Sequence, residues 1–219
     1  MDKNIIILIK FVEEYEHAKM AQEGKLYMNP IGGYTEFKEK VIDLREDKNE
    51  GICQNYQPNK SKLIINNTLI DPKDIVGPIK VNMNKDLRKH VYCMYSLYFQ
   101  GGCISDKDLI IDKKVKGFGD WFLLITNVSE FFKRLDKKLK TLNISAKRKL
   151  VEYKDLNKHH GKVDSFIKNI NYSYQKEYRI VLNYYNKGPY ILDIGDISDI
   201  SLIGQTKDVF NMIKIEETM

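Results

Sequence analysis

The start of the chain alternates between apolar runs and a polar stretch of helix-forming residues. Residues 5–12 are mostly β-branched and apolar, with Lys10 near their end, which predicts a buried strand. Residues 13–23 begin with acidic side chains and are followed by Gly24, a pattern typical of a helix that ends at a glycine. Residues 25–29 precede Pro30 and predict a second short strand. We therefore expect a strand–helix–strand unit here.

The middle of the chain is less regular, apart from one aromatic run. Residues 62–69 and 75–81 predict short strands or a hairpin, because proline-containing turns interrupt them. Residues 90–99 are rich in tyrosine and predict a central strand.

The C-terminal half predicts a strand, a helix and a closing group of strands. Residues 121–126 are apolar, and Asn127 or Ser129 can cap a following helix that has an apolar stripe. The closing strands are expected at residues 174–185, 190–194 and 197–203. Together these elements predict one α+β domain over residues 1–219, with two small, mostly antiparallel sheets and flanking helices.

Composition narrows the class of protein without naming a function. The 219 residues are 42% hydrophobic and 30% charged, which is ordinary for a globular chain. The apolar run near the N-terminus is too short to span a bilayer and has no signal-peptide cleavage site. Three cysteines without paired spacing favour free thiols in a reducing compartment, so we expect a cytoplasmic protein and no metal site. The net charge of +6 would aid encounter with an acidic partner.

The late strand carries the most informative polar residues. Gln175, Glu177 and Arg179 alternate along it, so a strand would project all three on one face. A buried carboxylate is costly without a partner, and Arg179 is close enough to supply one. A structural Glu–Arg ion pair explains the same pattern and is the commoner reason for it.

Other candidate chemistry is weaker. Cys93 and Ser96 are three residues apart on the aromatic strand, so their side chains point to opposite faces of the sheet. Neither has a histidine at a spacing that would indicate a catalytic pair, so a nucleophilic triad is not expected. The charged run at residues 45–51 does not match a calcium loop and predicts a solvated turn. Phosphate-binding glycine loops are absent from the sequence.

The order of short motifs resembles a family of bacterial and phage proteins. That family has a Lys-aromatic pair, a glycine-bounded second strand, an Asp-x-x-Glu loop, a Cys-bearing strand with a nearby Ser, a Val-x-Tyr strand and a late Glu-Tyr-Arg strand. The matching residues are Lys10-Phe11, Gly24 to Tyr27, Asp47 to Glu50, Cys93 to Ser96, Val151 to Tyr153 and Glu177 to Arg179.

This family in turn looks like a distant relative of the ADP-ribosyltransferase superfamily. The resemblance implies an ADP-ribosyltransferase-like fold of two small sheets with NAD in the cleft between them. It implies catalytic roles for Glu177, which would stabilise an oxocarbenium-like state, and for Gln175, which would orient the acceptor. NAD-binding roles would fall to Lys10, Ser96, Tyr27 and Arg179. The expected reaction is transfer of ADP-ribose from NAD to a macromolecule in phage–host conflict.

A second hypothesis comes from a different class of protein. Small phage proteins of this size often inhibit host defence by binding a nuclease or effector, without chemistry. The basic charge and the many tyrosines suit an interface with a host protein or a nucleic acid. An enzyme should show a pocket with Gln175 and Glu177 on its floor, whereas an inhibitor should present an exposed patch and tolerate loss of Glu177.

Overall fold

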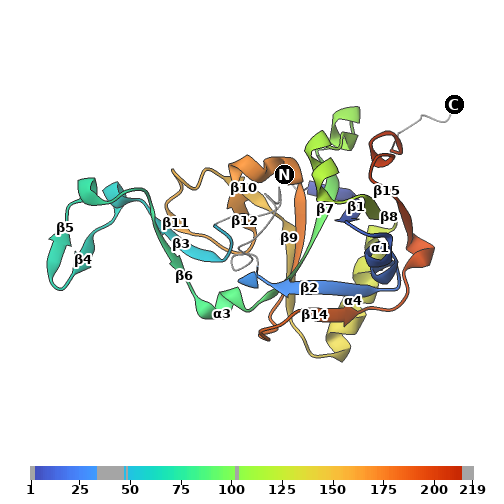
Figure 1. The fold of residues 1–219 in the computed structure, drawn as a ribbon, viewed down its shortest axis with the longest axis horizontal. Helices are drawn as coiled ribbons and strands as arrows, with labels where there is room; N and C mark the ends of the chain where they lie inside the picture. The colour runs from blue at the N-terminus through green and yellow to red at the C-terminus, as the bar shows by residue number, and fades with distance from the viewer. Residues whose placement is uncertain (1–2, 34–46, 48, 102–103, 214–219) are drawn as a thin grey trace.

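The computed structural model describes residues 3–33, 47, 49–101 and 104–213. Most of its strands form one eight-stranded sheet with antiparallel neighbours, in which the path β14-β2-β7-β1-β8-β15 is joined by β13 and β9 (Figure 1). The strands of this sheet are β1 (Lys3–Val12), β2 (Lys25–Pro30), β7 (His90–Gln100), β8 (Trp121–Ile125), β9 (Ala146–Leu150), β13 (Glu177–Leu182), β14 (Tyr190–Asp193) and β15 (Ser201–Gln205).

The prediction of two small sheets in an ADP-ribosyltransferase-like fold is therefore wrong. The physical reason is the long strand β7, which is paired along both of its edges. Residues 90–95 pair with β13 on one edge, while β2 and β1 pair with residues 90–91 and 95–100 on the other. Strand β1 then pairs with β8, so the ladder continues across what we expected to be a gap between sheets.

Two apolar layers cover the two faces of the large sheet. One face packs against α4 (Val128–Thr141), whose Phe131, Leu135 and Leu139 are buried, and against Ala21 of α1 (Tyr15–Gln22). Asn127 caps α4 by accepting from the Glu130 backbone N–H, as the sequence suggested. The other face carries a separate cluster around Phe122.

The other strands form three minor sheets. They are the parallel pair of β10 (Glu152–Lys154) with β12 (Ile167–Asn169), the three-stranded sheet of β11 (Gly161–Lys162), β3 (Ile52–Tyr56) and β6 (Ile79–Asn82), and the hairpin of β4 (Leu63–Ile65) with β5 (Thr68–Ile70). The remaining helices in the described ranges are α3 (Asn84–Leu87) and the 3-10 turns η1 (Pro58–Lys60), η2 (Pro72–Asp74), η3 (Asp106–Leu109), η4 (Lys113–Phe118), η5 (Ile170–Gln175), η6 (Ser198–Ile200) and η7 (Val209–Asn211).

The β4–β5 hairpin projects at the far end of the long axis, away from the large sheet (Figure 1). We call residues 57–83, which run from η1 through the hairpin and η2 to β6, the arm. The turn of the hairpin is formed by Asn66 and Asn67 with φ of 48° and 61°, the left-handed pair that a two-residue hairpin loop requires. Among the described residues, no helix is both long and apolar enough to cross a membrane.

Candidate functional site

The late strand, which the sequence predicts from residue 174, begins three residues later, at Glu177. Gln175 ends the 3-10 turn η5, and β13 starts at Glu177. Lys176 lies between them with φ of 38°, a left-handed conformation that a residue with a Cβ adopts only at a cost. Glu177 and Arg179 therefore share one strand face, as predicted, whereas Gln175 is not on that strand and is linked to Glu177 through another side chain.

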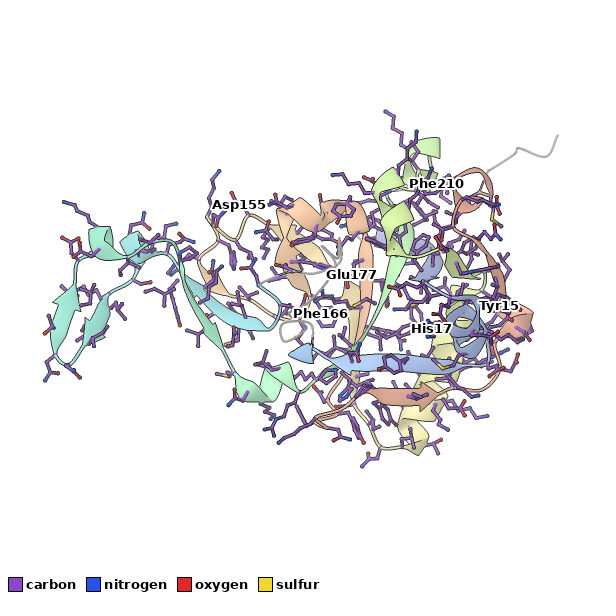
Figure 2. The ribbon with its side chains drawn as sticks, viewed as in Figure 1. Tyr15, His17, Asp155, Phe166, Glu177 and Phe210 are labelled. Atoms are coloured by element: carbon purple, nitrogen blue, oxygen red, sulfur yellow. The ribbon has the colours of Figure 1, made fainter. Side chains whose placement is uncertain are left out.

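The side chain that links Gln175 to Glu177 is Lys168, which lies on β12. Its Nζ donates to Gln175 Oε1 at 2.7 Å and to Glu177 Oε2 at 3.4 Å. Lys168 and Gln175 are each 3% exposed, and Glu177 is 7% exposed. Figure 2 places Glu177 midway along the molecule, with Phe166 nearby and Tyr15 and His17 at the opposite end from the arm. The two predicted catalytic side chains thus meet through one buried ammonium group.

Arg179 joins this group to a loop from the other half of the chain. Its Nε donates to Glu177 Oε1 at 2.9 Å, and its Nη2 donates to Glu50 Oε2 at 3.0 Å. Its Nη1 also donates to the Ser165 carbonyl oxygen at 2.6 Å. We call Glu50, Lys168, Gln175, Glu177 and Arg179 the buried ion cluster. Its two carboxylates and two cations balance within a volume shielded from solvent.

The charges in the buried ion cluster are fixed by one another. Burial alone would raise the pKa of Glu177, but Arg179 and Lys168 together hold it well below its usual value, so the carboxylate is ionised. Burial would lower the pKa of Arg179, and Glu177 and Glu50 raise it well above its usual value instead. Glu177 and Arg179 therefore depend on their partners to remain charged in this buried position.

Two further groups touch Glu177 without adding charge. Burial, aided by Glu177, raises the pKa of the Cys93 thiol, so Cys93 stays protonated and is a poor nucleophile. The Tyr153 hydroxyl oxygen accepts from the Glu177 backbone N–H at 2.9 Å, and burial raises the pKa of that hydroxyl too. Both groups are therefore neutral neighbours of Glu177.

The charged run at residues 45–51 is not a solvated turn where the structure describes it. Asp47 is buried, and Glu50 pairs with Arg179. Residues 45, 46 and 48 lie outside the described residues. Gly51 has φ of 80°, and a Cβ there would lie 2.3 Å from the Leu87 side chain, so the loop that carries Glu50 needs glycine at this position. Residues 49–51 do form a turn, and only the predicted solvation is wrong, because the partner, Arg179, is 129 residues away in sequence.

Most of the six motifs that carried the family resemblance meet here. Asp47, Glu50, Cys93, Tyr153 and the pair Glu177 and Arg179 all belong to the buried ion cluster or touch it or its loop. Sequence reasoning missed Lys168 because no pattern marks it. Glu50 could have been found from its place in the Asp-x-x-Glu loop directly before Gly51.

The remaining predicted NAD-binding residues lie outside the buried ion cluster, at different distances along the sheet. Lys10 Nζ donates to the Cys93 carbonyl oxygen at 3.0 Å and sits over the Tyr92 ring, in the stretch of β7 between its pairings with β1 and β2. Ser96 is fully buried and donates to the Lys176 carbonyl oxygen. Tyr27 is exposed on β2, where it pairs with Ile191 of β14. Lys10 and Ser96 thus each bond to a residue beside Glu177, namely Cys93, whose thiol contacts the carboxylate, and the chain neighbour Lys176, whereas Tyr27 lies on a different part of the sheet.

The arm is the second region with unusual chemistry. Ile64 and Leu69, which face each other across the hairpin, are 61% and 59% exposed, and Val76 is fully exposed. An open depression of about 560 Å³ lies at the base of the arm, lined by Gln57, Lys73 and Asn157 among others.

In the part of the chain that the structure describes, no group of acidic, histidine or cysteine side chains could hold a metal ion. The chain matches no family model, no curated protein and no solved structure.

Proposed function

We propose that the protein acts by binding a macromolecular partner without chemistry, as expected of a stoichiometric inhibitor of a host nuclease or effector. The exposed aliphatic surface of the arm carries this proposal. Single apolar side chains are common on protein surfaces, but several on one projecting hairpin mark an interaction site. A two-stranded hairpin is also marginally stable alone, so contact with a partner would stabilise it.

The state of Glu177 and Gln175 supports the same proposal. Both are buried, and Glu177 is already neutralised by Arg179 and Lys168. A carboxylate paired with two cations offers little net negative potential to a developing oxocarbenium ion. The residues that the sequence favours for catalysis are therefore well placed to hold the fold together.

The experiment is a titration of the purified partner's activity with the purified protein. An inhibitor that works by binding should give a sharp endpoint at one-to-one stoichiometry. Glu177→Gln should retain that endpoint at a temperature where circular dichroism shows the variant to be folded. Inhibition at strongly substoichiometric amounts, or its loss in folded Glu177→Gln, would contradict the proposal.

ADP-ribosyl transfer from NAD is the second candidate function, and one observation favours it. Lys176 holds a strained conformation directly between Gln175 and Glu177, and such strain gathers at active sites. Incubation with labelled NAD and cell lysate tests this candidate. Transfer of label that stops in Glu177→Gln but continues in the control Glu130→Gln, at a half-buried carboxylate on α4, would favour it over binding alone.

A further inference from the structure

The hairpin of the arm is apolar on both of its faces. Ile64 and Leu69 share one face, and Leu63, Ile65 and Ile70 share the other, according to the strand register. Residues 63–70 include no charged side chain and no proline. A hairpin that lay on a flat surface would need one apolar face only, so this one is suited to a cleft that contacts both.

Lysines surround the base of the hairpin. The segment at residues 155–162 packs against the start of the arm, since the Gln57 side chain donates to the His159 carbonyl oxygen, as does Asn55 on the preceding strand β3. In residues 57–83 and 155–162, six lysines stand against three aspartates. The lysines are Lys60, Lys62, Lys73, Lys80, Lys158 and Lys162, and the aspartates are Asp71, Asp74 and Asp155. The base of the arm is therefore basic while its end is uncharged.

The tip of the hairpin argues against insertion into lipid. Asn66, Asn67 and Thr68 form the outermost turn and would have to enter the apolar layer first, at a cost for each polar group. A cleft in a protein can instead be open at both ends, so that the polar turn passes through it and remains in water. The same net positive charge on every copy also disfavours pairing of two arms.

Resting on the proposed function, we propose that the arm inserts into an aliphatic cleft of a partner protein whose rim carries Asp and Glu. The hairpin fills the cleft with Ile64, Ile65 and Leu69, and its unpaired strand edges can add to a sheet in the partner. The lysines at the base meet the acidic rim, which steers the encounter and fixes the depth of insertion.

The test uses the full chain with a benzophenone amino acid in place of Ile64, irradiated in lysate of cells in which the protein is active. A matched probe replaces Ile191, an exposed aliphatic residue on β14 of the large sheet. We expect strong crosslinking at position 64 to a peptide that combines aliphatic and acidic residues. With the purified pair, Ile64→Ser combined with Leu69→Ser should weaken binding at least tenfold. Lys60→Glu combined with Lys62→Glu should weaken it severalfold, and binding of the unmodified chain should fall as salt rises.

Other outcomes overturn the inference and separate it from the proposed function. Crosslinking of position 64 only to a second copy, or cosedimentation with phosphatidylcholine–phosphatidylglycerol vesicles that Ile64→Ser abolishes, would replace the cleft with a different occupant. Crosslinking to another protein at position 191 but not at 64 would leave the binding function standing and remove the arm from it. An affinity that does not change with salt would contradict the inference that the rim of the cleft is acidic. If neither probe crosslinks, both the binding function and this inference fail.

Discussion

The buried ion cluster places charged side chains in the interior of the molecule, whereas the arm places aliphatic side chains on its surface. In the cluster, Glu177, Arg179 and Lys168 are buried and Glu50 is largely shielded from solvent, whereas aliphatic side chains on the arm face solvent. The two regions are also neighbours in the chain. Glu50 and Gly51 immediately precede β3, the first strand of the sheet that carries the arm. The comparison indicates that the cluster anchors the loop that leads into the sheet carrying the arm, while the aliphatic side chains of the arm stay exposed.

The two regions differ in what each contributes to stability. Buried ions are expensive to desolvate, and their main effect is to specify one arrangement of the elements that they join. The buried ion cluster joins β13, β12 and the loop before β3 in this way. The arm buries little of its apolar surface, so its side chains contribute little to folding. We therefore expect mutations to separate into large effects at the cluster and small effects at the arm.

The largest expected effect comes from removing the central cation of the cluster. Arg179→Met leaves Glu177 and Glu50 without their main partner in a buried site. Breaking a buried pair in this way costs about 3–5 kcal/mol of the free energy of unfolding. Urea denaturation would measure the loss. The control is Arg148→Met, which breaks a surface ion pair with Asp136 and should cost about 1 kcal/mol or less. Equal losses for the two variants would contradict the role assigned to the cluster.

Acid should weaken the cluster by a smaller amount, because protonated Glu177 can still form hydrogen bonds. Its folded pKa lies below the unfolded value of about 4.3, so its stabilisation is complete above that pH and is lost as pH falls toward the folded pKa. We expect the free energy of unfolding to decrease as pH is lowered from about 5. In Glu177→Gln this dependence should be flatter, measured by urea denaturation across the same pH range. A Glu177→Gln curve parallel to that of the unmodified chain would rule out this coupling.

Sequence patterns predicted the local elements better than their assembly. The expected strand–helix–strand unit is confirmed as β1, α1 and β2, and the aromatic strand at residues 90–99 is confirmed as β7. These elements depend on local periodicity and on residues such as Gly24, which are visible in the sequence. The single large sheet was not predicted, because its continuity depends on pairing along both edges of β7, which no local pattern encodes.

The candidate site shows the same limit. Glu177 and Arg179 could be paired from their spacing on one strand, and that pair is present. Lys168 and Glu50 enter through tertiary contacts, so the sequence could not show that the carboxylate at position 177 is already neutralised. Lys176 was expected in a strand, and its left-handed conformation depends on contacts from other elements, such as the bond from Ser96 to its carbonyl oxygen.

A pair of glycine substitutions can test how the cluster positions the arm. Gly51→Ala introduces both a strained positive φ and a Cβ 2.3 Å from the Leu87 side chain, whereas Gly77→Ala, with φ of 75°, meets nothing within 4 Å. We expect Gly77→Ala to cost about 1 kcal/mol from backbone strain alone, and Gly51→Ala to cost about 1–3 kcal/mol more because Leu87 must move. Thermal unfolding of both variants gives the difference. Equal losses of the free energy of unfolding in the two variants would show that the loop before β3 and the Leu87 side chain rearrange to accept the added Cβ at no extra cost.

The smallest expected effect on stability concerns the arm. Ile64 and Leu69 are largely exposed, so replacing either with serine removes almost no buried apolar area and should change the free energy of unfolding by no more than about 0.5 kcal/mol. Leu97→Ser, at a fully buried position on β7, is the matched control and should cost several kcal/mol, since it leaves a cavity and buries a hydroxyl. Urea denaturation measures all three variants. If Ile64→Ser were as costly as Leu97→Ser, the arm would be packed against the rest of the chain and would not be available to a partner. If its cost is small while partner binding is lost, the aliphatic side chains of the arm serve binding and not folding.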